Sequence, residues 1–197
     1  MRVIAGLARG KRLEVPEVGV RPTMDRVKAA IFSSLHDRVV GARVLDLFAG
    51  TGALGIEALS RGAAAALFVE EDRAAVQAIE QNFIRTKLRG AVRKQEVFAF
   101  LESAGSREQF DIVFADPPYE KTKQGGEFTR LLLEHRRIAE LLLPGGIFVL
   151  EKRPGEEIVP PFLWEIVRSK RYGATEVLFL QHAGTNVAPV GSEADEA

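Results

Sequence analysis

The segment Asp116-Pro117-Pro118-Tyr119 follows an apolar stretch at 111–115 and carries the residue types of an amino-group binding site. Two consecutive prolines fix the backbone and remove two N–H donors, so the Asp116 carboxylate and the Pro117 carbonyl can both act as acceptors. An exocyclic amine of a nucleic-acid base is a poor nucleophile because its lone pair is delocalised into the ring. Two acceptors can hold its hydrogens during in-line methyl transfer from a sulfonium, and Tyr119 offers an aromatic face for a flipped-out base. A plain proline turn after a strand is the alternative interpretation.

A glycine-rich loop stands earlier in the chain, where Asp46 is followed by Gly50, Gly52 and Gly55 in the spacing of a nucleotide-binding turn. Glu70, 20 residues after the first glycine, can accept the ribose hydroxyls of an adenosine. A pyrophosphate is disfavoured beside the Asp46 anion, whereas a ligand ammonium could pair with it. The loop therefore favours S-adenosylmethionine over a nicotinamide dinucleotide, in whose chemistry the proline loop has no role. A strand–helix turn that only packs is the remaining alternative.

The composition excludes several kinds of chemistry. The chain has no cysteine, which excludes disulfides, thiolate zinc sites, iron–sulfur clusters and a cysteine nucleophile. Three histidines, His36, His135 and His182, lie far apart, so we expect no metal site. No apolar run approaches the roughly 18–20 residues of a membrane span, and the first residues do not form a secretory signal. We expect a cytoplasmic protein without a membrane partner.

The net charge is zero, but the charges are unevenly distributed. Residues 1–40 contain eight lysines and arginines against four acidic residues, and the remaining 157 residues contain 19 against 23. A basic arm on a mildly acidic body is one way to bind nucleic acid locally. A solvated charged surface is the alternative for this segment alone.

Hydrophobic periodicity predicts an alternation of strands and helices after a short N-terminal extension. Expected strands lie at 43–47, 65–70, 91–94, 111–115, 147–151, 163–169 and 175–180. Expected helices lie at about 25–36, from the glycine loop to about 60, at 73–85, at about 97–103 and at 128–143. This order predicts an α/β fold, a Rossmann-like methyltransferase domain with a mostly parallel seven-stranded sheet and an antiparallel last strand. We predict three regions: an RNA-engaging β-hairpin and helix at 1–40, the methyltransferase domain at 41–182, and a disordered tail at 183–197.

The chain resembles the RsmD family, which methylates N2 of a guanine in small-subunit ribosomal RNA. The resemblance runs from residue 2 to about residue 180 and is carried by MRVIAGLARGKRLEVP, RPTMDRVKAAIFSSL, VLDLFAGTGALGIEALSRGA, FVEEDRAA, DIVFADPPY and RYGATEVLFL. The glycine loop alone indicates only the methyltransferase superfamily. The N-terminal block and RPTMDR are more specific to the family.

The resemblance implies a role for each matching residue. S-adenosyl-L-methionine would be bound by Asp46, Phe48, Gly50, Gly52 and Glu70, with Glu96 and Val97 where related enzymes place an aspartate that reaches the adenine. The target base would be held by Asp116, Pro117, Pro118 and Tyr119. The 16S rRNA of the small subunit would be contacted by Arg9, Lys11, Arg12, Arg21, Thr23 and Arg26.

The leading hypothesis is therefore a 16S rRNA guanine-N2 methyltransferase, acting as a monomer. Three alternatives stay open: an amino methyltransferase for DNA adenine or cytosine, a similar enzyme for protein glutamine, and a non-catalytic ribosome-assembly factor. The small size, without a target-recognition domain, speaks against a sequence-reading DNA enzyme, and glutamine enzymes favour asparagine where Asp116 stands. The intact Asp46, Glu70 and Asp116 speak against a factor that has lost catalysis.

Overall fold

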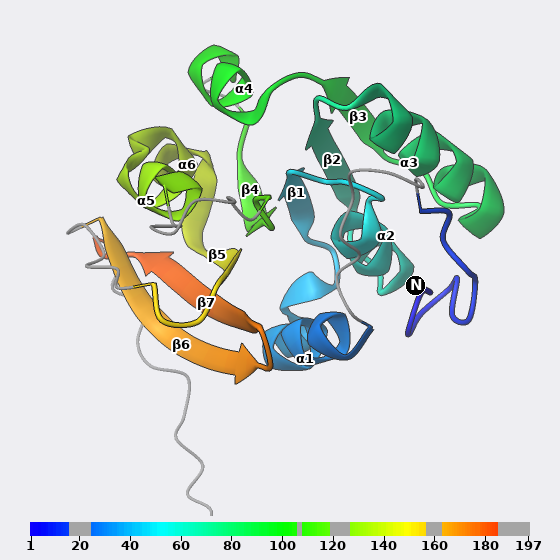
Figure 1. The fold of residues 1–197 in the computed structure, drawn as a ribbon, viewed down its shortest axis with the longest axis horizontal. Coiled ribbons are helices and arrows are strands. Elements are labelled where there is room, and N and C mark those ends of the chain that lie inside the picture. Colours follow the sequence, from blue (N-terminus) through cyan, green and yellow to red (C-terminus); the bar gives the residue numbers. More distant parts are fainter. Residues whose placement is uncertain (16–24, 106–107, 119–126, 157–162, 185–197) are drawn as a thin grey trace, which may run out of the picture.

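Apolar strands that alternate with amphipathic helices build a seven-stranded sheet with helices on both faces (Figure 1). The structure is a computed structural model that describes residues 1–15, 25–105, 108–118, 127–156 and 163–184. Predictions for Arg21, Thr23, Tyr119 and most of the C-terminal tail therefore fall outside the described residues.

The strands are β1 (Arg43–Leu47), β2 (Ala65–Glu70), β3 (Ala91–Lys94), β4 (Phe110–Ala115), β5 (Leu142–Lys152), β6 (Trp164–Tyr172) and β7 (Thr175–His182). The α-helices are α1 (Asp25–Leu35), α2 (Ala53–Ser60), α3 (Arg73–Thr86), α4 (Val97–Ser103), α5 (Glu127–Glu134) and α6 (Arg136–Leu141), and a 3₁₀ helix, η1 (His36–Val39), follows α1.

The strand order is β3-β2-β1-β4-β5-β7-β6. The first five strands are parallel, and β7 runs antiparallel to both β5 and β6. The order reverses between β1 and β4, which is the point where open parallel sheets bind ligands. The predicted Rossmann-like fold, with a mostly parallel seven-stranded sheet and an antiparallel last strand, is confirmed.

The sheet has an apolar core on each face. One core packs β-strand side chains against α1, α2 and α3, and contains Phe32, Phe68 and Phe114. The other packs the opposite face against α4, α5 and α6, and contains Phe100 and Phe148. No helix among the described residues is long and apolar enough to cross a membrane.

The predicted single helix at 128–143 is wrong. The structure has two helices there, separated by His135 in an extended conformation (φ −77°, ψ 101°), and the second ends at Leu141. The Trp164 Nε1–H donates to the Leu133 carbonyl at 2.8 Å, so that carbonyl is satisfied by a side chain where a continuous helix would use a backbone amide. Strand β5 also begins earlier than expected, and a bulge between Leu142 and Ile147 absorbs the Pro-Gly-Gly sequence.

The N-terminal segment folds back on itself and docks onto α2. Residues Arg2 and Arg12 form a single antiparallel bridge. The β-hairpin expected in this region would have two paired strands. The Ser60 hydroxyl accepts from the Ala8 amide at 2.9 Å. Gly6 has φ +80°, and a Cβ there would lie 1.7 Å from the Ser60 carbonyl oxygen, so only glycine fits this contact.

A buried ion pair fixes this docking. The side chains of Lys28 and Glu57 are both fully buried, with Nζ 3.3 Å from Oε2. The Glu57 carboxylate also accepts from the amides of Ile4 at 2.8 Å and Ala5 at 3.0 Å, and from Arg61 Nε at 2.8 Å. Burial is the largest influence on Lys28 and lowers its pKa, although Glu57 acts in the opposite direction. One carboxylate of α2 therefore holds α1 and the N-terminal segment together.

Candidate functional site

The predicted site residues meet at the carboxyl-terminal edge of the parallel strands. Leu47 at the end of β1 is in register with Val69 of β2 on one side and with Ala115 of β4 on the other. The glycine loop after β1, Glu70 at the end of β2 and Asp116 after β4 therefore lie side by side at one edge of the sheet (Figure 1).

The glycine loop makes a tight turn into α2. Phe48 (φ 55°) and Gly50 (φ 55°) have left-handed backbones, and Gly52 (φ 73°) is the N-cap residue of the helix. The Gly52 amide donates to the Ala49 carbonyl at 2.7 Å, which closes the turn. A Cβ at Gly55 would lie 2.3 Å from the Phe68 ring, so this glycine lets α2 approach the sheet.

Asp46 is a buried carboxylate directly beneath this loop. Its side chain is 2% exposed, and Oδ2 accepts from the Gly55 amide at 2.8 Å. Burial raises the pKa of Asp46 to about 8; the Gly55 hydrogen bond opposes the shift, and the charges of Asp116 and Glu70 add to it. Three carboxylates thus share one electrostatic environment, which disfavours an anionic ligand and favours a cationic one.

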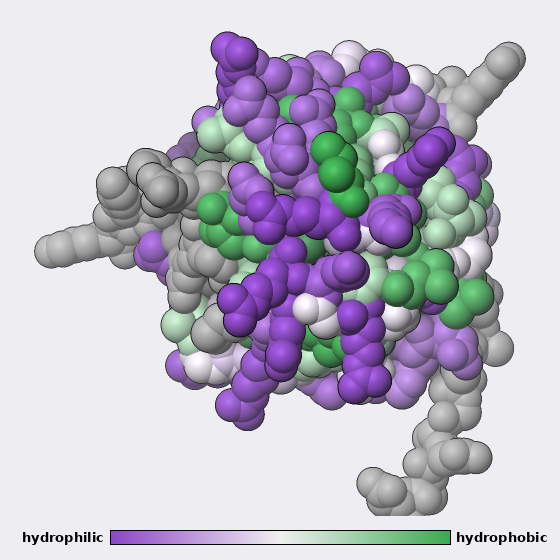
Figure 2. Space-filling view, turned by 90° about the vertical axis from the view of Figure 1, so that its right-hand side faces the viewer, coloured by the Kyte–Doolittle hydropathy of each residue, from purple (hydrophilic) through white to green (hydrophobic). Residues whose placement is uncertain are grey.

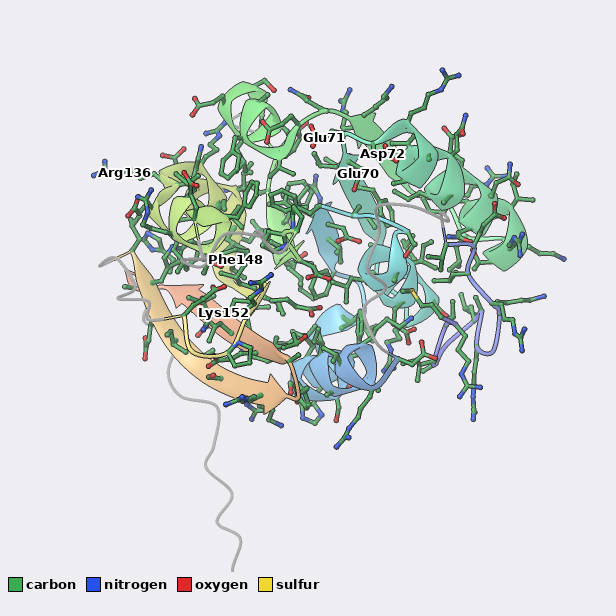
Figure 3. All side chains as sticks on the ribbon, viewed as in Figure 1. Glu70, Glu71, Asp72, Arg136, Phe148 and Lys152 are labelled. Carbon is green, nitrogen blue, oxygen red and sulfur yellow. The ribbon has the colours of Figure 1, made fainter. Side chains whose placement is uncertain are left out.

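Glu70 holds the glycine loop from the neighbouring strand. Its Oε2 accepts from the Gly50 amide at 2.8 Å, and its Oε1 accepts from the Asp72 amide at 2.9 Å. Figure 3 shows Glu70 with Glu71 and Asp72 where β2 leads into α3. Each oxygen of an ionised carboxylate has a second lone pair, so these bonds leave acceptor capacity for ribose hydroxyls.

Glu96 has a structural role that the sequence interpretation missed. It is the N-cap residue of α4, and its carboxylate accepts from the amides of Phe98 at 2.9 Å and Ala99 at 2.8 Å. Val97, the next residue, is buried in the core. The position expected to reach an adenine is therefore occupied by a carboxylate that already caps a helix.

Three half-buried phenylalanines line the same end of the sheet. The Phe48 ring centroid lies 5.8 Å from that of Phe128 and 6.4 Å from that of Phe98, and Phe98 stacks on Phe128 at 6.1 Å. Phe48 was predicted, whereas Phe98 and Phe128 were not. Phe98 could have been found from its place two residues after Glu96, but Phe128 comes close only through the tertiary fold.

The Asp-Pro-Pro segment is placed as the sequence predicted. Asp116 is half-buried, Pro117 is buried and Pro118 is exposed, and Tyr119 lies outside the described residues. Because Asp116 contributes to the raised pKa of Asp46, the carboxylates of the two motifs are close enough to interact. Among the described residues, no group of three or more histidine, aspartate or glutamate side chains could hold a metal ion.

The four predicted RNA-binding residues that the structure describes lie on the surface. Arg9, Lys11 and Arg12 are exposed in the turn of the N-terminal segment, and Arg26 is exposed in the first turn of α1. Figure 2 shows the side of the molecule that carries the N-terminal segment and α3, on which hydrophilic side chains predominate. Arg21 and Thr23 lie outside the part of the chain that the structure describes.

Asn82 connects this N-terminal segment to the glycine loop. It is fully buried on α3, and its Nδ2 donates to the Thr51 carbonyl at 3.0 Å and to the Glu14 carbonyl at 3.1 Å. Its Oδ1 accepts from the Glu14 amide at 2.7 Å. A single side chain therefore ties the loop between Gly50 and Gly52 to the segment that leads toward Arg21.

The sequence and the fold are similar to those of known proteins. The family model described as "Conserved hypothetical protein 95" matches residues 1–181. A relative from Haemophilus influenzae, Ribosomal RNA small subunit methyltransferase D, is 32% identical over 186 residues, which cover 92% of this chain and 94% of the relative. The protein of the same name from Escherichia coli is 44% identical over 123 residues, which cover 61% of each chain. A solved structure of a hypothetical protein from Thermus thermophilus has a TM-score of 0.77 and 33% identity, and the match covers 92% of this chain and 99% of that one.

Proposed function

Because the chain belongs to the family described as Conserved hypothetical protein 95, we propose that it methylates the N2 amine of a guanine in the 16S rRNA of the small ribosomal subunit. The resemblance to the RsmD family is confirmed, and the chain is an S-adenosylmethionine-dependent methyltransferase of ribosomal RNA. The base, its reacting atom and the residue roles are the proposal. The observation that carries it is the register between Leu47 and Ala115, which puts the Asp-Pro-Pro segment beside the glycine loop.

The residues at the glycine loop fit the cofactor. S-adenosylmethionine supplies a methyl group on a positively charged sulfonium. In our proposal Asp46 pairs with the ammonium group of its amino-acid end, Glu70 accepts the ribose hydroxyls, and Gly50 and Gly52 allow close backbone approach. Phe48 and Val97 provide apolar contacts near the adenine, and Glu96 accepts from its amino group while it caps α4.

Asp116 and Pro117 hold the target amine in our proposal. The Asp116 carboxylate and the Pro117 carbonyl each accept one hydrogen of the amine, which orients the nitrogen lone pair toward the methyl group. Pro118 keeps the segment rigid, and Tyr119 stacks on the flipped-out base. The proton released after transfer passes to water, so no further base is required.

The N-terminal region 1–40 engages the RNA in our proposal, and residues 41–182 form the catalytic domain. RNA phosphates are contacted by the exposed side chains of Arg9, Lys11 and Arg12. Such contacts provide much of the affinity for nucleic acid and do not depend on its sequence. Arg21, Thr23 and Arg26 make further RNA contacts in our proposal. The enzyme acts as a monomer.

Methyl-labelled S-adenosylmethionine tests the proposal. The protein is incubated with small ribosomal subunits from cells that lack its gene, with naked 16S rRNA and duplex DNA in parallel, and the labelled nucleosides are identified. We expect N2-methylguanosine in ribosomal RNA. Label in DNA or in another nucleoside would overturn the guanine assignment, and the absence of label from every substrate despite cofactor binding would favour a non-catalytic assembly factor.

Cofactor binding is expected to release a proton at neutral pH. The free protein holds Asp46 largely protonated at pH 7, because its pKa is raised to about 8. A ligand ammonium favours the ionised carboxylate. The affinity for the cofactor should therefore rise about tenfold for each pH unit below 8. Calorimetric titration with S-adenosylhomocysteine between pH 6 and 7.5, in buffers of different ionisation enthalpy, measures the proton directly. Asp46→Asn should bind more weakly and release none; equal proton release by the variant would contradict the assignment.

A further inference from the structure

A row of side chains crosses four strands at the site edge. Leu150 of β5 is in register with Ala115 of β4, so the next residues, Glu151 and Asp116, are neighbours on adjacent strands. Glu151 is directly opposite Val177 of β7, and Val177 is directly opposite Lys170 of β6. Residues opposite one another in a sheet point to the same face, so Glu151 and Lys170 lie on one face, and Asp116 directly follows the neighbouring strand β4.

That face is the one on which the cofactor loop lies. Asp46 is in register with Phe114, and Phe114, like Val177, belongs to the core that packs against α1 and α2. Glu151 is opposite Val177, so Asp46 and Glu151 both face this side, and Asp116 follows β4, the strand that lies between β1 and β5. Glu151 is only 3% exposed, whereas Lys170 at the end of the row is exposed.

The proposed reaction gives Asp116 a role but leaves Glu151 without one. Neither carboxylate is without a partner in the protein, and an ionised carboxylate has lone pairs for further donors. A buried glutamate in an apolar strand is uncommon unless the carboxylate has a structural or functional role, because removing an ionised carboxylate from water is unfavourable. Adjacent strands lie about 4.8 Å apart, which lets both carboxylates reach one base edge.

We propose that Glu151 reads the Watson–Crick edge of the target base by accepting the N1–H of guanine while Asp116 holds its N2 amine. This inference rests on the proposed guanine-N2 activity and extends it to specificity. Guanine presents two adjacent donors, N1–H and N2–H, whereas adenine presents an acceptor at N1. An ionised Glu151 therefore attracts guanine and repels adenine. Exposed Lys170, on the same face, is placed for the phosphate of the flipped nucleotide.

The test changes the hydrogen-bonding groups of the base and, separately, those of residue 151. Small subunits are reconstituted with either guanine or 2-aminopurine at the methylated position; 2-aminopurine keeps the N2 amine but carries an acceptor at N1. Wild-type protein should prefer guanine by about 100-fold in kcat/KM, since a carboxylate facing the N1 lone pair leaves a buried charge unpaired. Glu151→Gln can donate its amide to that lone pair, so its preference should fall below about fivefold.

Two further variants control for structure. Glu151→Asp keeps the charge and should keep the preference for guanine even if kcat falls. Glu165→Gln removes an exposed carboxylate from β6 and should change neither rate nor preference. Cofactor affinity, measured separately for each variant, should stay within a few-fold of wild type.

The outcomes separate the two proposals. Wild-type label at guanine N2 together with a collapsed preference in Glu151→Gln supports both. Wild-type label at guanine N2 with the preference unchanged in Glu151→Gln, or lost equally in Glu151→Asp, leaves the proposed function standing and overturns the role of Glu151. Wild-type label on an adenine or cytosine of the natural rRNA, and none on guanine, overturns both.

Discussion

Asp116→Ala is expected to abolish methyl transfer, with a loss of at least about 10³-fold, while S-adenosylhomocysteine affinity stays within a few-fold of wild type. The carboxylate follows β4 beside the glycine loop, and its removal takes away an acceptor that positions the amine in the transition state. Cofactor binding depends mainly on Asp46 and Glu70 in our proposal. Single-turnover transfer to small subunits and calorimetric titration of the cofactor product measure the two effects separately.

Asp116→Asn is the matched control for this variant. It keeps the shape and one oxygen acceptor but loses the charge, so its rate should lie between those of Asp116→Ala and wild type. Retention of most activity by Asp116→Ala would refute the acceptor role. A parallel loss of cofactor affinity would instead place Asp116 in the cofactor site.

Glu57→Ala should be the most destabilising substitution considered, lowering the free energy of unfolding by roughly 3–5 kcal/mol. Its removal leaves the fully buried Lys28 ammonium without the carboxylate 3.3 Å away. It also leaves the amides of Ile4 and Ala5 without their acceptor. Urea unfolding followed by circular dichroism gives the free energy, and protease cleavage near the N-terminus reports whether this segment has come away from α2.

An exposed ion pair provides the comparison. Arg130 and Glu134 are one helical turn apart on α5, and both side chains are at least half exposed. Glu134→Ala should cost about 0.3–0.5 kcal/mol, because water screens such pairs. Equal effects of the two substitutions would mean that burial of the Lys28–Glu57 pair does not determine its contribution.

The sequence predicted the fold well where a strand is short, apolar and bounded by turn residues, as β1 and β4 are. It failed where a distant residue decided the local structure. The break at His135 depends on Trp164, which lies 31 residues after Leu133 and donates its indole N–H to the Leu133 carbonyl. The early start of β5 depends on its pairing with Phe110, which overrides the usual meaning of Pro-Gly-Gly as a strand boundary.

The candidate site was predictable to the extent that its residues stand at the ends of strands that are neighbours in the sheet. Asp46, Glu70 and Asp116 each stand where an apolar strand meets a turn, so their proximity follows from the topology. Glu151, to which we assign the reading of the base edge, was not predicted, because a lone glutamate at the end of a strand matches no motif of the sequence analysis. The hydrogen bonds of Asn82 were also not predictable, because they join α3 to Thr51 and Glu14, which lie 31 and 68 residues earlier in the chain.

Side chains from three neighbouring elements hold the backbone of the glycine loop. Glu70 accepts the Gly50 amide, Asn82 donates to the Thr51 carbonyl, and Asp46 accepts the Gly55 amide. The conformational entropy of this turn is therefore lost during folding and not again when the nucleoside arrives. Exchange of the Gly50 and Gly55 amide hydrogens should consequently be slow in the free enzyme and change little on saturation, and association should resemble the docking of two rigid bodies.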